Sequence, residues 1–60
     1  MTAGEVDRER AAALAAQARE LFERQEYREA RPVYEESLRL HEDPEVRAAY
    51  QTLMSAIGPA

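Results

Sequence analysis

Few side chains in this sequence could do chemistry, and most of them are carboxylates. Glu35-Glu36 and Glu42-Asp43-x-Glu45 place acidic groups close together, as general acid–base catalysis or a bound divalent cation would require. The first pair falls in a stretch of helical periodicity, where we expect a solvated face with Arg39 within i,i+4 reach of Glu35. The second group spans a helix-capping turn. Neither has the ligand count or geometry of a metal site, so we predict no bound metal.

The other candidates for catalysis are equally sparse. His41 is the only histidine, and we expect it in the last turn of a helix, where the helix dipole favours a partly charged imidazole. The chain has no cysteine, no nucleophile–base arrangement and no glycine-rich phosphate loop. We therefore predict that the protein is not an enzyme and takes neither a cofactor nor a small-molecule substrate.

Charge and hydropathy argue against further classes of function. The net charge of −4 disfavours nucleic acid, whose phosphates require a basic surface. No apolar run approaches the ~20 residues of a membrane span, and the polar start MTAGEVDRER is unlike a signal peptide. We expect a cytoplasmic protein. Eight arginines without a lysine are typical of a GC-rich genome, so we also expect a bacterial source.

The elements that must position these side chains are helices. Apolar residues recur at helical spacing and predict helices over about residues 3–24, 27–41 and 44–57. Short turns between them force neighbours to run antiparallel, so the predicted fold is an all-α, three-helix antiparallel bundle in a single domain. Arg19 and Glu23 are spaced for an i,i+4 ion pair on the outer face of the first helix.

The ends of the first and third helices carry local signals. Thr2 and Glu5 have the spacing of a capping box at the start of the first helix. Asp43 before Pro44 is typical of an N-cap followed by the first helical residue. Gly58-Pro59 is typical of a helix stop.

Alanine is the commonest residue, which leaves a thin core and makes association with another copy or a partner a reasonable expectation. Ala18 and Ala30 lie on the inward stripes of the first two helices, where small side chains let two backbones approach closely. Ala12 and Ala16 lie with Arg19 on another face of the first helix. These two alanines either serve helix propensity or form a second contact surface with Arg19.

The third helix has one narrow apolar stripe, formed by Val46, Tyr50, Leu53, Met54 and Ile57. If this helix rolls inward, it buries all five side chains. Otherwise Val46, Ala49 and Leu53 pack on the second helix, and Tyr50, Met54 and Ile57 remain partly open. Exposed apolar patches usually mark a contact. We expect these three residues to receive a helix from another copy or from a different protein.

A longer pattern covers residues 11–57. The chain carries in order Leu14-x2-Gln17-Ala18-x2-Leu21, Tyr27-Arg28-Glu29-Ala30, x3-Tyr34, Ser37-Leu38 and Pro44. This order resembles one tetratricopeptide repeat followed by the first helix of a second. The resemblance implies a helical hairpin in which Ala18 packs on Ala30, with Tyr27 and Tyr34 at the repeat's aromatic positions. It also implies a protein that binds peptides or helices and performs no chemistry.

Several positions depart from that repeat. Leu14 stands where a bulky aromatic is usual, Gln17 where leucine is, Gln25 where a turn glycine is, and Pro32 interrupts the second helix. Ala15 and Arg19 occupy the places of the Lys and Asn that clamp a C-terminal carboxylate in one subclass, so that clamp is absent.

These observations predict a protein–protein interaction module or adaptor that docks a partner helix or peptide. The first alternative is a structural subunit that assembles as a homo-oligomer. The second is a domain similar to the microtubule-interacting-and-transport family, whose second helix is usually longer than the one predicted here. A helix-turn-helix regulator is disfavoured because its recognition helix would contain a single basic residue, Arg47.

Overall fold

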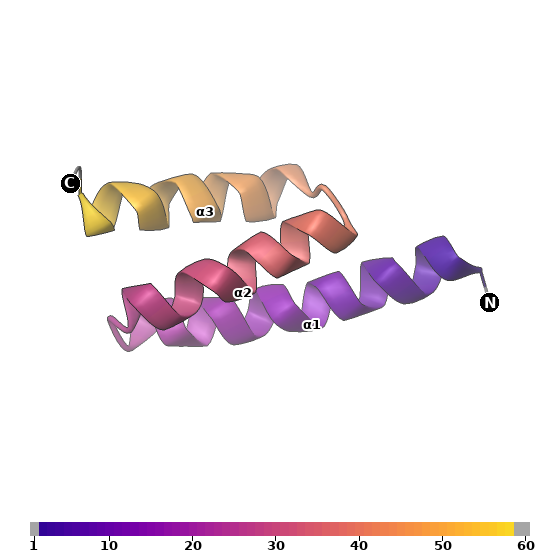
Figure 1. Cartoon of the computed structure of the whole chain (residues 1–60), viewed down its shortest axis with the longest axis horizontal. Helices are drawn as coiled ribbons and strands as arrows, with labels where there is room; N and C mark the ends of the chain where they lie inside the picture. The colour runs from indigo at the N-terminus through magenta and orange to yellow at the C-terminus, as the bar shows by residue number, and fades with distance from the viewer. Residues whose placement is uncertain (1, 59–60) are drawn as a thin grey trace.

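Three helices make up the structure, a computed structural model that describes residues 2–58. They are α1 (Ala3–Glu23), α2 (Tyr27–Leu40) and α3 (Pro44–Ile57). In Figure 1, α2 runs antiparallel to α1, α3 runs antiparallel to α2, and the N-terminal part of α1 extends beyond the end of α2. No strand occurs within the described residues. The predicted all-α, three-helix arrangement is confirmed.

The helix ends lie within one residue of those predicted. α1 and α2 each end one residue early, because Arg24 and His41 are capping residues with non-helical continuation, not members of the last turn. The Oγ1 atom of Thr2 accepts a hydrogen bond from the Glu5 amide at 3.3 Å, and Oδ1 of Asp43 accepts one from the Glu45 amide at 2.9 Å. Both side chains therefore satisfy amides that have no partner inside their helix.

The last turn of α3 ends at Gly58, whose φ of 83° lies in the region that side chains rarely adopt. Its amide donates to the Met54 carbonyl at 3.2 Å, which closes the final turn. The predicted stop at glycine is thus confirmed, and Pro59 lies outside the described residues.

The turn between α1 and α2 reverses the chain around Gln25. This residue has a φ of 65°, a left-handed conformation that is usually given to glycine. The Gln25 amide donates to the Phe22 carbonyl and the Glu26 amide to the Leu21 carbonyl, both at 2.9 Å. This pair of bonds is the Schellman motif of a helix C-terminus. The Phe22 and Tyr27 rings flank the turn with centroids 5.3 Å apart.

The core is a small cluster centred on α2. Ala18, Ala30 and Leu53 have no exposed surface, and Tyr34 retains 3%. All four belong to one packed cluster with contributions from each helix. The predicted burial of Ala18 and Ala30 at the α1–α2 crossing is confirmed. Each side chain is a single methyl group, so the two helix backbones can approach closely there.

A buried hydrogen bond fixes the C-terminal half of α2 against α1. The Ser37 hydroxyl donates to the Ala11 carbonyl at 2.7 Å, and both residues are buried. The bond satisfies a hydroxyl that could not otherwise be buried at low cost. It also explains why a polar residue lies on the inward stripe of α2.

Pro32 does not break α2, which is one helix from Tyr27 to Leu40. The proline is exposed, so its ring displaces no core side chain. Because proline has no amide hydrogen, it removes one intrahelical hydrogen bond of α2.

Candidate functional site

A groove runs between α1 and α3, with α2 as its floor. α3 packs on α2 and approaches α1 at only a few points, so the outer two helices do not close over the middle one. Two adjoining hollows of about 390 Å³ and 310 Å³ lie there and share Arg19, Tyr34 and Ala49 as lining residues. We call this the α1–α3 groove. Its further lining residues are Ala15, Ala16, Phe22, Glu23, Glu45, Val46 and Thr52.

The wall that α1 contributes has alanines at one end, beside Arg19. Ala16 and Arg19 are exposed and line the groove, and Ala15 is half-buried beside them. Ala12 lies farther toward the N-terminus, at a small hollow of about 90 Å³ that continues along the same side of α1. Methyl-sized side chains leave the backbone of α1 open to close approach along more than one helical turn.

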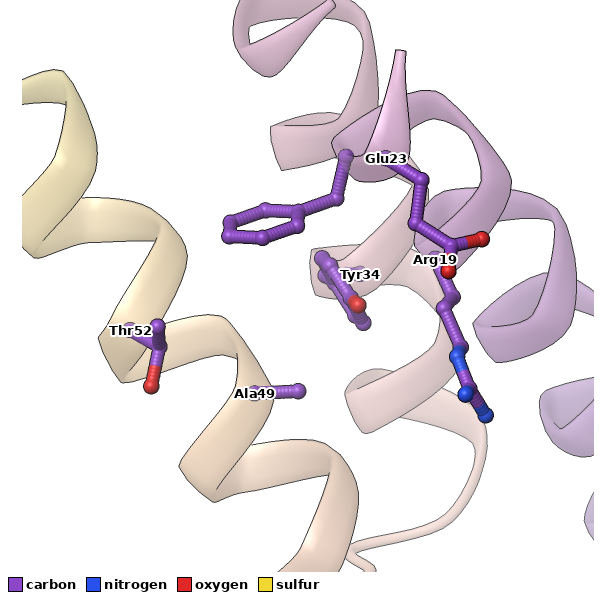
Figure 2. A pocket seen from close by; sticks show the side chains of 6 residues that line it. Arg19, Glu23, Tyr34, Ala49 and Thr52 are labelled. Atoms are coloured by element: carbon purple, nitrogen blue, oxygen red, sulfur yellow. The ribbon is translucent and has the colours of Figure 1, made fainter. Parts of the chain in front are cut away.

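The floor and one end of the groove carry polar groups. Tyr34 is almost fully buried, yet its hydroxyl forms no hydrogen bond with another described residue and is not sealed from solvent. Figure 2 shows the Tyr34 ring between Ala49 of α3 and the Arg19 and Glu23 side chains of α1. Burial raises the pKa of Tyr34 above its usual value; Arg19 opposes this shift and Glu23 adds to it.

Arg19 is a free cation at the rim of this groove. Within residues 2–58 it forms no ion pair, so the predicted Arg19–Glu23 pair is not formed. In the turn that follows α1, Arg24 contacts Glu26 at 3.8 Å. The groove therefore combines apolar walls with one guanidinium, the carboxylates of Glu23 and Glu45 and one open phenol hydroxyl, which can fix the orientation of a bound chain.

Tyr50, Met54 and Ile57 lie on a different surface, the side of α3 turned away from the groove. We call these three residues the α3 outer face. Tyr50 and Met54 are half-buried and Ile57 is 39% exposed, whereas Leu53 of the same stripe is fully buried. The alternative in which α3 buries the whole stripe is therefore wrong, because the helix rests on α2 along one edge of the stripe only.

Charged groups of α2 surround the Tyr50 side of this face. The Tyr50 hydroxyl donates to Oε2 of Glu35 at 2.7 Å, and Nε of Arg31 donates to the same oxygen at 3.2 Å. Arg47 makes a two-pronged contact with Glu42 at 2.7 and 2.9 Å. Its guanidinium carbon lies 5.9 Å from the centre of the Tyr50 ring.

Three of the acidic residues noted in the sequence, Glu35, Glu36 and Glu42, are thus engaged by arginines, and Asp43 caps α3. The predicted contact between Arg39 and Glu35 is wrong: Arg39 pairs with Glu36, and Glu35 is held by Arg31 and Tyr50. His41 follows α2 as its capping residue and is half-buried. Among the described residues, no three His, Asp or Glu side chains come together as a metal-binding group.

The six predicted partner-binding residues therefore divide between two surfaces. Ala16 and Arg19 line the α1–α3 groove and Ala12 lies at the small hollow beyond it, whereas none of the three α3 outer-face residues lines any of these hollows. Sequence reasoning missed Tyr34 and Ala49 as groove residues because both also belong to the core side of their helices. The spacing of Ala12, Ala16 and Arg19 was the signal that a continuous strip of α1 faces one direction.

The Tyr50–Glu35 bond predicts a defined pH dependence. It lowers the pKa of Glu35, with a smaller contribution from Arg31, and it raises the pKa of Tyr50. Its contribution to stability is complete between the ordinary pKa values of about 4.3 for Glu and about 10 for Tyr. It is lost as pH falls through the lowered pKa of Glu35 or rises through the raised pKa of Tyr50.

We expect Tyr50→Phe to lower the melting temperature at pH 7 by about 2–4 °C, since a solvated hydrogen bond contributes about 0.5 kcal/mol. The difference from wild type should shrink below pH ~4 and above pH ~10. Circular dichroism melts across this range measure it. Tyr27→Phe is the control, because the Tyr27 hydroxyl bonds no other described residue. A difference that is independent of pH would contradict the assigned bond.

Comparison with protein-family models, with curated proteins and with solved structures finds no match. None of the described helices is long and apolar enough to cross a membrane. What the chain shows of its function therefore comes from the groove and from the α3 outer face.

Proposed function

We propose that this protein is a non-enzymatic interaction module that binds a helix or extended segment of a partner protein in the α1–α3 groove. The observation that carries the proposal is the groove itself. Two adjoining hollows floored by Tyr34 lie between helices that pack on α2 and scarcely on each other. Binding sites for chains and small molecules are mostly apolar concavities with a few placed polar groups, and this groove has that composition.

The polar groups of the groove suggest what kind of segment fits it. Alanine walls at Ala15, Ala16 and Ala49 admit apolar side chains or a closely approaching backbone. Arg19 can pair with an acidic group on the bound chain, Glu23 and Glu45 can pair with basic groups, and the open Tyr34 hydroxyl offers a hydrogen bond. A partner segment with apolar residues and charged residues of both signs beside them has the matching chemistry.

We further propose that the hairpin and α3 are similar to one tetratricopeptide repeat and the opening helix of the next. Three features support this: the buried Ala18 and Ala30 at the crossing, the left-handed Gln25 where the repeat has glycine, and the aromatic Tyr27 and Tyr34. The 14-residue α2 is shorter than the 21-residue α1, which disfavours the domain with a long second helix. Such a module would act in the cytoplasm and would catalyse no reaction.

A peptide library displayed on phage tests the proposal. We expect wild type to enrich peptides that carry apolar residues with nearby charged residues of both signs. Ala16→Leu fills the groove and should weaken their binding about tenfold or more. Ala13→Leu is the matched control: it makes the same substitution at another exposed position of α1 that lines no hollow. Enrichment of no peptide, or equal binding to both variants, would refute the groove as the binding site.

A further inference from the structure

α3 is unlike the other helices in having almost no charge. One third of the chain is charged, yet the segment 48–58 has no charged side chain. Val46, Ala49 and Tyr50 pack on the core around Leu53, whereas the rest of the uncharged segment 48–58 is exposed or half-buried. Helices that face water normally carry charged residues on that side. An uncharged exposed helix therefore indicates a surface that is covered by another protein surface.

The charges that border the α3 outer face are neutralised within the chain. Arg31 pairs with Glu35, and Arg47 pairs with Glu42. The protein has a net charge of −4, so two copies repel each other wherever unpaired acids meet. Two copies that approach through their α3 outer faces meet no such repulsion, because the acidic side chains at the border of this face are paired with arginines.

We propose that a second copy of this chain packs on the α3 outer face, with the two α3 helices antiparallel about a two-fold axis. In this arrangement Tyr50 contacts Met54 of the second copy, and Arg47 lies over the C-terminal end of the second copy's α3 near Ile57. The pair Tyr50–Met54 and the pair Arg47–Ile57 have the same midpoint along α3, at Thr52. A two-fold axis that passes this point therefore forms each contact twice, once from each copy.

Each of these contacts joins groups of complementary chemistry. The polarisable sulfur of Met packs favourably on an aromatic ring. The last turn of α3 has no basic residue, so its carbonyl end carries an uncompensated partial negative charge. Arg47 of the second copy bonds its own Glu42 through Nε and Nη2, so its exposed Nη1 group remains to donate to these carbonyls. A foreign helix would need to supply both features, whereas a second copy carries them in the required positions.

The exposed area also favours association. The chain exposes 4447 Å² and extends over 41 × 18 × 15 Å. A compact monomer of this mass would expose about 3,950 Å². Small domains with thin cores commonly gain their remaining stability by association.

Sedimentation equilibrium of the full chain tests the proposal. We expect wild type to shift from its monomer mass of 6.8 kDa to twice that mass. The shift should fall between roughly 5 µM and 500 µM, as for an interface at the small end of the specific range. Ile57→Arg places a cation opposite Arg47 of the second copy and should weaken the dimer about tenfold or more. Ser55→Arg adds the same charge at an exposed position beyond the α3 outer face and should leave the dimer unchanged.

Ile57→Glu tests the register, because its carboxylate would face the same Arg47. It should dimerise about tenfold more tightly than Ile57→Arg. Ile57 is at the last turn and exposed, so circular dichroism should show both variants folded. A wild type that remains monomeric, an unaffected Ile57→Arg, or equal weakening by Arg and Glu would overturn the proposal. Ala16→Leu should fill the groove without affecting the dimer, which separates this proposal from peptide binding.

Discussion

Leu53→Ala is expected to remove about half of the stability of the folded protein at 25 °C. Leu53 is the largest side chain with no exposed surface, and it joins α3 to the cluster that holds Tyr34 and Ala30. Truncating a buried leucine costs about 2–5 kcal/mol because a cavity replaces its contacts. A chain of this length has roughly 3–9 kcal/mol of stability in total. The loss is therefore about half of the total stability.

Circular dichroism at 222 nm during urea titration measures this effect. Amide hydrogen exchange adds where the loss begins: since α3 packs mainly on α2, its amides should lose protection before those of α1. Met54→Ala is the matched control, because Met54 is the next residue of the same helix and is only half-buried. Similar urea midpoints for Leu53→Ala and Met54→Ala would show that α3 is not anchored through Leu53.

Ala30→Leu is expected to destabilise the protein by about 1–3 kcal/mol. Ala30 is fully buried at the α1–α2 crossing, where Ala18 faces the same cluster from α1. The added atoms have no space unless the helices move apart. Such movement would also strain the 2.7 Å bond from Ser37 to the Ala11 carbonyl.

Thermal melts compare this variant with wild type and with Ala13→Leu. Alanine and leucine are both strong helix formers, so propensity contributes little to either substitution. Ala13 is exposed on α1, and a leucine there should leave the melting temperature nearly unchanged. A melting temperature for Ala30→Leu that equals that of Ala13→Leu would refute the close approach of α1 and α2 at this position.

The sequence alone could not assign the ion pair of Arg39, because two carboxylates are within its reach along the helix. Arg39 can reach a carboxylate three or four residues earlier, and the periodicity of α2 does not distinguish Glu36 from Glu35. The structure pairs it with Glu36, while Glu35 accepts hydrogen bonds from Arg31 and Tyr50. The contact that decides this comes from α3, which no spacing within α2 reveals.

By itself the sequence determined the three helices, the caps at Thr2 and Asp43, the stop at Gly58 and the burial of Ala18 and Ala30. These features follow from interactions within a few residues or from the repeat of one helix. Only the tertiary structure decided that α1 and α3 stand apart over Tyr34, and that Met54 and Ile57 face away from the groove. Both depend on how α3 is rotated and where it rests on α2. That choice is made by packing around Leu53, between residues far apart in the chain.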